Sequence, residues 1–241
     1  MKKKPLIVVT GASSGIGEAI AQRFSEAGYP LLLLARRLER LQALNLPNAI
    51  CTGVDVTDRA AFAKAVNDAE SKYGPVDCLI NNAGVMLLGQ IDTQDPDEWQ
   101  KMFDINVIAL LNGMHLVLGP MKARKGGTII NISSIAGYKT FPNHAAYCGT
   151  KFAVHAISEN VREEVADSNV RVITVAPGVV ETELLSHTTS DDIKTGYDSW
   201  KQGIGGAINP DDIARAVVFA YQQPQSVCMR TMVIAPTKQQ P

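Results

Sequence analysis

The feature that most constrains the fold is an alternation of short apolar segments with longer segments of helical periodicity. Most of the short segments are continuous apolar runs, which are typical of strands buried on both faces of a parallel sheet. The predicted strands are Leu6–Thr10, Leu31–Ala35, Ala49–Val54, Cys78–Ile80, Thr128–Ile132, Arg171–Ala176 and Thr231–Ile234. The predicted helices are Gly15–Ala27, Arg59–Tyr73, Asp97–Met121, Ala145–Ala166 and Asp211–Gln222. This order predicts βαβ units, and therefore an α/β fold with helices on both faces of a parallel sheet.

One connection departs from the alternation. Residues Val179–Ala207, between the sixth predicted strand and the last predicted helix, are rich in Gly, Ser, Thr and Asp. Connections of this length are usually lids or binding loops, and this one follows the carboxyl end of a strand, where open α/β sheets bind ligands. We expect it to be a substrate loop that closes over cofactor and substrate. A helix cap and early acidic residues are expected after it, in Asn209–Asp212.

Composition and charge narrow the class of protein. The 241 residues are 46% hydrophobic and 20% charged, which allows one large buried core and predicts a single domain. A formal net charge of -1 gives no electrostatic footprint for nucleic acid or an anionic membrane, so we expect a small-molecule partner. The most apolar long stretch, Ile105–Leu118, is interrupted by polar residues and is shorter than a membrane span requires.

The cysteines and the start of the chain indicate a reduced, cytoplasmic protein. No C-x-x-C pair or His/Cys ligand spacing is present, so no metal site is predicted and the cysteines are interpreted as reduced core residues. They are Cys51, Cys78, Cys148 and Cys228. The basic residues Lys2–Lys4 resemble the start of a signal peptide, but the apolar run after them breaks at Thr10-Gly11 and is too short for one. That run is interpreted as the first strand.

A glycine-rich turn, Thr10–Gly17, joins the first predicted strand to the first predicted helix. Gly11 can make the tight turn, Gly15 leaves room for a pyrophosphate, and Gly17 allows close packing of helix and strand. The amides and dipole of the helix N-terminus favour an anion at the same place. An ordinary βα turn is the alternative, but the position between strand and helix favours a dinucleotide site.

The end of the second predicted strand indicates which dinucleotide. An NAD-selective site normally places an acidic side chain about twenty residues beyond the glycine turn, and Ala35 stands there instead. Arg36 beside it offers a guanidinium suited to a 2′-phosphate, and Ser13 and Ser14 could donate further hydrogen bonds. We predict NADP(H) as the cofactor. Arg37 is interpreted more readily as a solvated residue at the start of a helix.

Four polar side chains suggest proton-transfer chemistry. Tyr147 and Lys151 stand four residues apart on a predicted helix and share one face, so the ammonium should lower the phenol pKa from about 10 toward neutral. Such a tyrosine is a general acid for carbonyl reduction and a general base for alcohol oxidation. Ser134, after the fifth predicted strand, could hold the substrate oxygen. Asn106 is expected to be a buried amide that needs a specific partner.

Together these motifs resemble those of the classical short-chain dehydrogenase/reductases, from Thr10 to about Ala235. T-G-x-x-x-G-I-G, N-N-A-G at 81–84 and P-G-x-x-x-T at 177–182 match the family's motifs. The family's catalytic tetrad is matched one by one by Asn106, Ser134, Tyr147 and Lys151. Taken in isolation, a Tyr-x-x-x-Lys pair is usually a solvated helix face, and Ser134 is a plausible turn residue. The resemblance implies a single Rossmann-type doubly wound domain over residues 1–241, with about seven parallel strands in the order 3-2-1-4-5-6-7.

The resemblance also implies roles for individual residues. Lys151 would contact the nicotinamide ribose, and Asn106 would support a water linked to it. Asp55 would bind the adenine amino group, and a helix-cap or turn role is the alternative for this residue. Val180 and Thr182 would lie beside the nicotinamide carboxamide and phosphate. The complete predicted cofactor site is Gly11, Ser13, Ser14, Gly15, Ile16, Gly17, Arg36, Asp55, Val56, Asn82, Ala83, Gly84, Tyr147, Lys151, Pro177, Gly178, Val180 and Thr182.

The leading hypothesis is therefore an NADP(H)-dependent oxidoreductase that acts on a carbonyl or alcohol. A catalytically silent NADP(H) sensor or scaffold on the same fold is the alternative, because fold alone does not establish activity. Specificity should arise from Val85–Gln94, Ala136–His144 and Val179–Ala207, and His144 is expected at the pocket rim or surface rather than as a second acid. The resemblance implies a homodimer or homotetramer in which two long helices pack against a neighbour.

Overall fold

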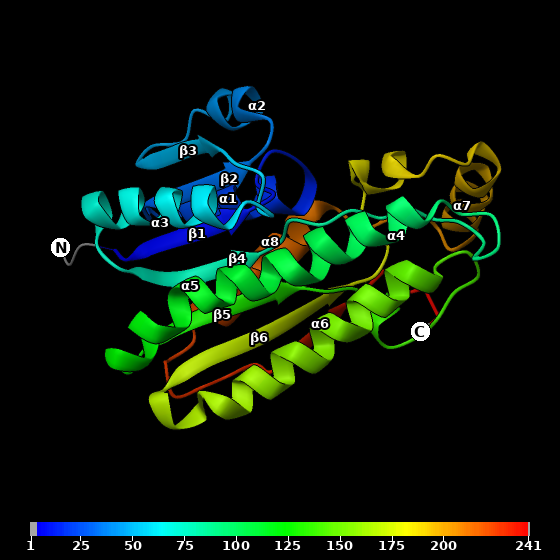
Figure 1. The fold of residues 1–241 in the computed structure, drawn as a ribbon. Helices are drawn as coiled ribbons and strands as arrows, with labels where there is room; N and C mark the ends of the chain where they lie inside the picture. Colours follow the sequence, from blue (N-terminus) through cyan, green and yellow to red (C-terminus); the bar gives the residue numbers. More distant parts are fainter. Residues whose placement is uncertain (1–3, 241) are drawn as a thin grey trace.

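The computed structural model describes residues 4–240, and in them a parallel seven-stranded sheet has the order β3-β2-β1-β4-β5-β6-β7 (Figure 1). The strands are β1 (Leu6–Thr10), β2 (Leu31–Ala35), β3 (Ala49–Gly53), β4 (Val76–Asn81), β5 (Gly127–Ile132), β6 (Val170–Pro177) and β7 (Thr231–Ile234). This confirms the predicted fold class and strand order. Residues 1–3 and 241, including Lys2 and Lys3 of the basic start, lie outside the described part.

Helices cover both faces of the sheet because successive residues of a buried strand point to opposite sides (Figure 1). Ile7 and Val9 face a core that includes residues of α1 (Gly15–Glu26) and α8 (Pro210–Gln222). Leu6 and Val8 face a second core with residues of α3 (Arg59–Tyr73), α5 (Ala109–Ala123) and α6 (Ala145–Glu164). The short helix α2 (Leu38–Ala43), after β2, is not among the predicted helices and was anticipated only in the interpretation of Arg37 as the start of a helix. All four cysteines are free thiols, although Cys51 and Cys228 are only half-buried.

The helix predicted over residues 97–121 is interrupted. The structure has α4 (Pro96–Phe103), a π-helical turn (Asp104–Ile108) and then α5. Such turns insert a residue into the helical repeat and occur frequently at functional sites; this one buries Asn106. By length and composition alone, the stretch Pro96–Ala123 could cross a membrane; its most apolar 18-residue window has a mean hydropathy of 1.5, but 44% of that window is buried in the fold. This stretch is longer than Ile105–Leu118, which the sequence pattern indicated as the most apolar segment.

The connection at 179–207 is more ordered than expected. It contains a 3-10 turn (Glu183–His187) and α7 (Asp191–Gly203), which lies at the end of the molecule toward which the strands of the sheet run (Figure 1). The signals for α7 were present in the sequence, because Ser190 caps it and acidic residues occupy its first turn. A parallel bridge between Val180 and Ile208 holds the two ends of the connection together. Its closure over ligands stays a prediction.

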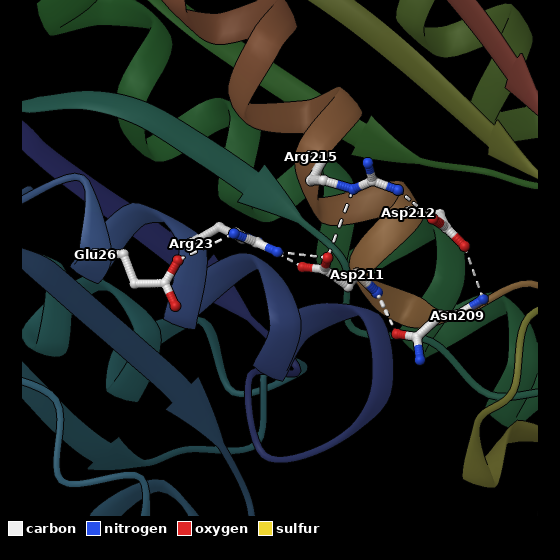
Figure 2. A network of polar contacts seen from close by, with 6 residues as sticks. All are labelled: Arg23, Glu26, Asn209, Asp211, Asp212 and Arg215. Carbon is white, nitrogen blue, oxygen red and sulfur yellow. Dashed lines mark hydrogen bonds and ion pairs between the residues drawn. The ribbon is translucent and has the colours of Figure 1, made fainter.

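A polar network joins α1 to α8 (Figure 2). Arg23 of α1 donates to both carboxylate oxygens of Asp211, from Nε at 2.5 Å and from Nη2 at 2.6 Å. Asn209 and Asp212 form a capping box at the start of α8, which confirms the predicted cap, and Arg215 pairs with both acidic residues. The bidentate geometry fixes the helix pair that packs against the sheet beside the glycine turn.

This network predicts a pH-dependent stability. The hydrogen-bonded Arg23 guanidinium holds the pKa of Asp211 below its ordinary value, so the pair stabilises the fold above the unfolded-state pKa of about 3.9 and this contribution is lost as the pH falls through the lower folded-state pKa. Both side chains are over a third exposed, so solvent screens the pair. We expect Asp211→Asn to lower Tm at neutral pH by at most about 2–4 °C.

A double-mutant cycle with Arg23→Gln isolates the pair from other effects of each substitution. The coupling free energy between Arg23 and Asp211 should be present at pH 7 and absent in acid, where Asp211 is protonated. Glu26→Gln is the control, since Glu26 is 65% exposed and makes a single contact with Arg23 at 3.2 Å. A coupling that persists unchanged at low pH would contradict the assignment.

Candidate active site

A cavity of about 910 Å³ lies at the carboxyl ends of the central strands, between the glycine turn and α7. All predicted site residues except Gly17 and Asn106 line it. They come from segments far apart in the sequence, and the parallel topology brings them together because the carboxyl ends of β1, β2, β4, β5 and β6 meet at one edge of the sheet.

The glycine turn is shaped to receive a phosphate. Gly11 has φ +64°, and a Cβ there would lie 2.8 Å from Ala83 Cα; a Cβ on Gly17 would lie 2.3 Å from the Gly11 carbonyl oxygen. No larger residue fits either position. Ser14 begins α1 but its side chain makes no capping hydrogen bond, so the amides of the first turn face the cavity without a side-chain acceptor. This arrangement fits the pyrophosphate of a dinucleotide.

Thr10 and Asn82 lock this turn to the neighbouring strand. Thr10 Oγ1 accepts hydrogen bonds from the amides of Asn82 and Ala83, both at 3.0 Å. Asn82 Nδ2 donates back to the carbonyls of Thr10 at 3.0 Å and Gly11 at 3.2 Å. The N-N-A-G segment therefore supports the turn through its backbone and one amide.

Arg37 does precede a helix, α2, and its side chain is 40% exposed, as the sequence interpretation expected. The structure adds a contact with the glycine turn, because its Nη2 donates to Ser14 Oγ at 2.9 Å and lies 3.4 Å from Ser13 Oγ. Its Nη1 contacts Glu183 at 2.9 Å. Arg36 is the more exposed of the two, and both line the cavity. Two arginines after β2 therefore line the cavity, of which Arg37 contacts the glycine turn.

Asp55 makes the turn that the alternative interpretation anticipated. Its Oδ1 accepts from the amide of Thr57 at 3.0 Å and from Thr57 Oγ1 at 2.7 Å. Burial raises its pKa, but the hydrogen bonds from Thr57 and the charge of Arg36 outweigh this and leave the pKa below the ordinary value. The carboxylate lines the cavity as well, so a turn role and a ligand contact are compatible.

Ser134 and Tyr147 meet inside the cavity. Ser134 follows β5 and begins a 3-10 turn (Ile135–Gly137), where its Oγ accepts from the Ala136 amide at 3.1 Å. Tyr147, in the first turn of α6, is 5% exposed, and the Ser134 side chain is close enough to its hydroxyl to favour the ionised form of the phenol. A phenol and a hydroxyl are thus presented together to a substrate oxygen.

The prediction that Lys151 lowers the pKa of Tyr147 is wrong. Burial raises the pKa of Tyr147 above its ordinary value, and only the hydrogen bond with Ser134 opposes this. Lys151 Nζ lies 5.7 Å from the Tyr147 ring centroid and donates to the Ile132 carbonyl at 3.1 Å, so its charge is not directed at the phenol. Burial lowers the pKa of Lys151 to about 8. At neutral pH the phenol keeps its proton.

Asn106 supports the site from behind the cavity wall. It is 3% exposed, its Oδ1 accepts from the Val85 amide, and its Nδ2 donates to the Val85 carbonyl, both at 2.9 Å. The same Nδ2 donates to Thr150 Oγ1 at 3.1 Å. Thr150, on the helix between Tyr147 and Lys151, was missed by the sequence analysis. The π-helical turn provides this geometry, because it places the amide of Asn106 toward α6.

Much of the remaining wall is apolar or aromatic. It comes from the three segments expected to set specificity: Val85, Met86, Leu88, Phe141, Leu184, Leu185, Ile193, Tyr197 and Trp200. Burial raises the pKa of Tyr197 to about 12. Gln239 also lines the cavity, and its Oε1 accepts from the Val179 amide at 2.9 Å; no sequence signal marked this return of the C-terminal segment.

A family model described as short chain dehydrogenase matches residues 5–193. The chain belongs to the short-chain dehydrogenase family. It is 40% identical over 243 residues to an uncharacterized oxidoreductase of Staphylococcus saprophyticus, with 98% of each chain covered. The closed form of serine dehydrogenase complexed with NADP+ has a TM-score of 0.91 and 31% identity, covering 98% of this chain and 96% of that one. A metagenomic short-chain oxidoreductase in complex with NADP has a TM-score of 0.80 and 31% identity, with 97% of each chain covered.

This short-chain dehydrogenase is therefore an oxidoreductase acting on CH–OH groups, with a nicotinamide dinucleotide as cofactor and a small molecule as substrate. Its glycine turn, the Thr10–Asn82 lock and the Tyr147–Ser134 pair supply the parts that such chemistry requires.

Proposed function

We propose that this short-chain dehydrogenase uses NADP(H) to reduce a carbonyl compound, reversibly with oxidation of the corresponding alcohol. The observation that carries the proposal is that Ser134, Tyr147 and Lys151 line the same cavity as the glycine turn. When bound, the nicotinamide supplies or accepts the hydride. The wall of the cavity at Tyr147 is apolar, which excludes water from the reacting atoms.

The protein's own residues handle the proton. Tyr147 donates its hydroxyl proton to the substrate oxygen during reduction, which suits a phenol that is protonated at neutral pH. Ser134 Oγ holds the same oxygen while negative charge develops on it. Lys151 contributes a positive charge within the buried site and is placed to contact the nicotinamide ribose. Asn106 and Thr150 fix α6, and with it the relative positions of Tyr147 and Lys151.

Preference for NADP(H) over NAD(H) is part of the proposal. Ala35 offers no carboxylate to repel a 2′-phosphate, and Arg36 and Arg37 line that part of the cavity. The Arg37 guanidinium beside the hydroxyls of Ser13 and Ser14 suits phosphate oxygens, and Arg36 adds a second positive charge to the cavity wall. The serine dehydrogenase and the metagenomic oxidoreductase, to which this chain is similar, were both solved with this cofactor.

The test is a cofactor-oxidation assay with purified protein, NADPH or NADH, and a panel of ketones and aldehydes, followed by the reverse reaction with alcohols and β-hydroxy acids. Turnover with NADPH supports the proposal. Tight NADPH binding with no turnover of any panel member would favour the cofactor-sensing alternative.

We also propose a homo-oligomer, formed through α4–α5 and α6. These helices carry large apolar side chains that are exposed in the single chain: Phe103 at 39%, Ile108 at 48%, Leu111 at 37% and Phe152 at 42%. Exposed apolar residues clustered on neighbouring helices are typical of an interaction surface. The family resemblance implies a dimer or tetramer through these helices.

We expect light scattering coupled to size-exclusion chromatography to give a dimer or tetramer for the wild type. Leu111→Glu combined with Phe152→Glu should shift it to smaller species, because each carboxylate would have to be desolvated in the interface. Ile91→Glu, which changes a 60% exposed side chain outside these helices, is the control. A monomeric wild type would contradict the proposal.

A further inference from the structure

Beside Tyr147, the cavity carries a histidine to which the proposed proton transfer assigns no role. His144 immediately precedes α6, one helical turn before Tyr147, and the two ring centroids are 6.3 Å apart. Its ring also stacks on Tyr197 of α7, with centroids 6.3 Å apart and an interplanar angle of 29°. His144 therefore stands between the acid/base residue and the helix that covers the substrate space.

A tight turn fixes the position of His144. Its amide donates to the Phe141 carbonyl at 3.2 Å, with Pro142 second in the turn and Asn143, at φ +65°, third, the pattern of a type II turn. The Asn143 carbonyl accepts from the Gly89 amide at 3.0 Å, which ties the turn to the neighbouring wall. A non-glycine residue at positive φ is uncommon, and such strain gathers at functional sites.

The hydrogen bonding of the ring determines what it can offer. Nδ1 of His144 lies 2.6 Å from the Pro142 carbonyl oxygen, and because a carbonyl only accepts, Nδ1 carries the proton. Burial lowers the pKa of His144 below its ordinary value, so the ring is neutral at neutral pH and Nε2 holds a free lone pair. Within residues 4–240 no group donates a hydrogen bond to Nε2 of His144. This atom is also not one of the fully buried side-chain atoms that lack a partner. The cavity thus presents a fixed hydrogen-bond acceptor.

The cationic side chains of the cavity lie elsewhere or are already engaged. Arg36 and Arg37 lie by the glycine turn, and Lys151 belongs to the proposed catalytic group. Lys201, the remaining cation among the described lining residues, lies 3.4 Å from Glu181 and 3.5 Å from Asp198. A substrate carboxylate would therefore find no free partner next to His144 in the described wall, whereas a hydroxyl or amino donor would find an acceptor.

Building on the proposed function, we infer that His144 is a specificity-determining residue whose Nε2 accepts a hydrogen bond from a hydroxyl or amino group next to the reacting carbonyl. The substrate class is α-hydroxy or α-amino ketones and aldehydes, with an apolar or aromatic remainder against Phe141, Tyr197 and Trp200. Because the ring centroids of His144 and Tyr147 are 6.3 Å apart, we place the donor near the reacting carbonyl rather than at the far end of the substrate.

The test compares two aromatic ketones that differ in the donor: 2-hydroxyacetophenone, which can donate to Nε2, and 2-methoxyacetophenone, which cannot. The readout is the ratio of their kcat/KM values with NADPH. We expect the wild type to favour the hydroxy ketone about ten- to hundredfold, because the methoxy ketone leaves Nε2 desolvated and unpaired. In His144→Phe, which keeps an aromatic ring without the acceptor, this ratio should fall to about one.

Two further variants keep the test decisive. His144→Gln retains a side-chain acceptor, so its ratio should exceed that of His144→Phe even if the phenylalanine variant is less stable. Tyr197→Phe removes the hydroxyl of the neighbouring ring and should keep the wild-type ratio.

Equal ratios in the wild type and both His144 variants, with turnover present, would overturn the inference and leave the proposed function intact. Loss of the ratio in Tyr197→Phe alone would assign the acceptor to Tyr197. Absence of turnover by the wild type on every carbonyl tested would overturn the proposed function and this inference with it.

Discussion

Tyr147→Phe is expected to lose nearly all turnover, by about 10²- to 10⁴-fold in kcat, while it still binds NADPH. The substitution removes the transferable proton and keeps the ring, which is 5% exposed and packs in the apolar wall of the cavity. The cofactor-binding turn is untouched, since it is held by Thr10 and Asn82. Steady-state kinetics and titration of NADPH fluorescence measure the two properties separately.

Lys151→Ala should damage both properties, because it removes a buried ammonium from the site and a group placed to contact the nicotinamide ribose. Tyr138→Phe is the matched control: it deletes a phenol that is 51% exposed and does not line the cavity, so it should turn over like the wild type. Activity of Tyr147→Phe equal to that of the wild type across the working pH range would show that another group moves the proton.

The second large effect concerns cofactor choice. We expect wild-type kcat/KM to be higher with NADPH than with NADH, and Ala35→Asp combined with Arg36→Ala to move the preference toward NADH. The new carboxylate would repel a 2′-phosphate and bind ribose hydroxyls instead. Each lost charge-assisted contact should cost ~1.5–3 kcal/mol, or about ten- to hundredfold in NADPH affinity.

The structure adds Arg37 to this prediction. Because its guanidinium already contacts Ser14, Arg37→Ala should weaken NADPH more than NADH. Arg40→Ala is the control. Arg40 contacts Glu183, like Arg37, but it does not line the cavity. The ratio of kcat/KM for the two cofactors is the measurement, and a wild-type preference for NADH would show that neither arginine serves a 2′-phosphate.

Sequence alone predicted the fold, which the structure confirms, and it proposed site residues of which all but Gly17 and Asn106 line the cavity. Continuous apolar runs of strand length are typical of central parallel strands, and their alternation with helical periodicity leaves few topologies. The glycine turn was equally legible, because a tight turn at positive φ and a close backbone approach exclude other residues, as Gly11 and Gly17 show. Spacing placed Tyr147 and Lys151 on one face of a helix, and the resemblance to the short-chain dehydrogenase/reductases joined them with Asn106 and Ser134 as a proposed catalytic group.

Tertiary structure decided everything that depends on burial and on contacts between distant segments. The π-helical turn at Asn106 follows from packing that periodicity cannot register. The pKa of Tyr147 is raised rather than lowered because desolvation depends on the whole cavity wall, whereas sequence spacing reveals one neighbouring charge. Arg37 turns toward the glycine turn and the His144 ring stacks on Tyr197 for the same reason: side-chain direction is set by neighbours brought close only when the chain folds.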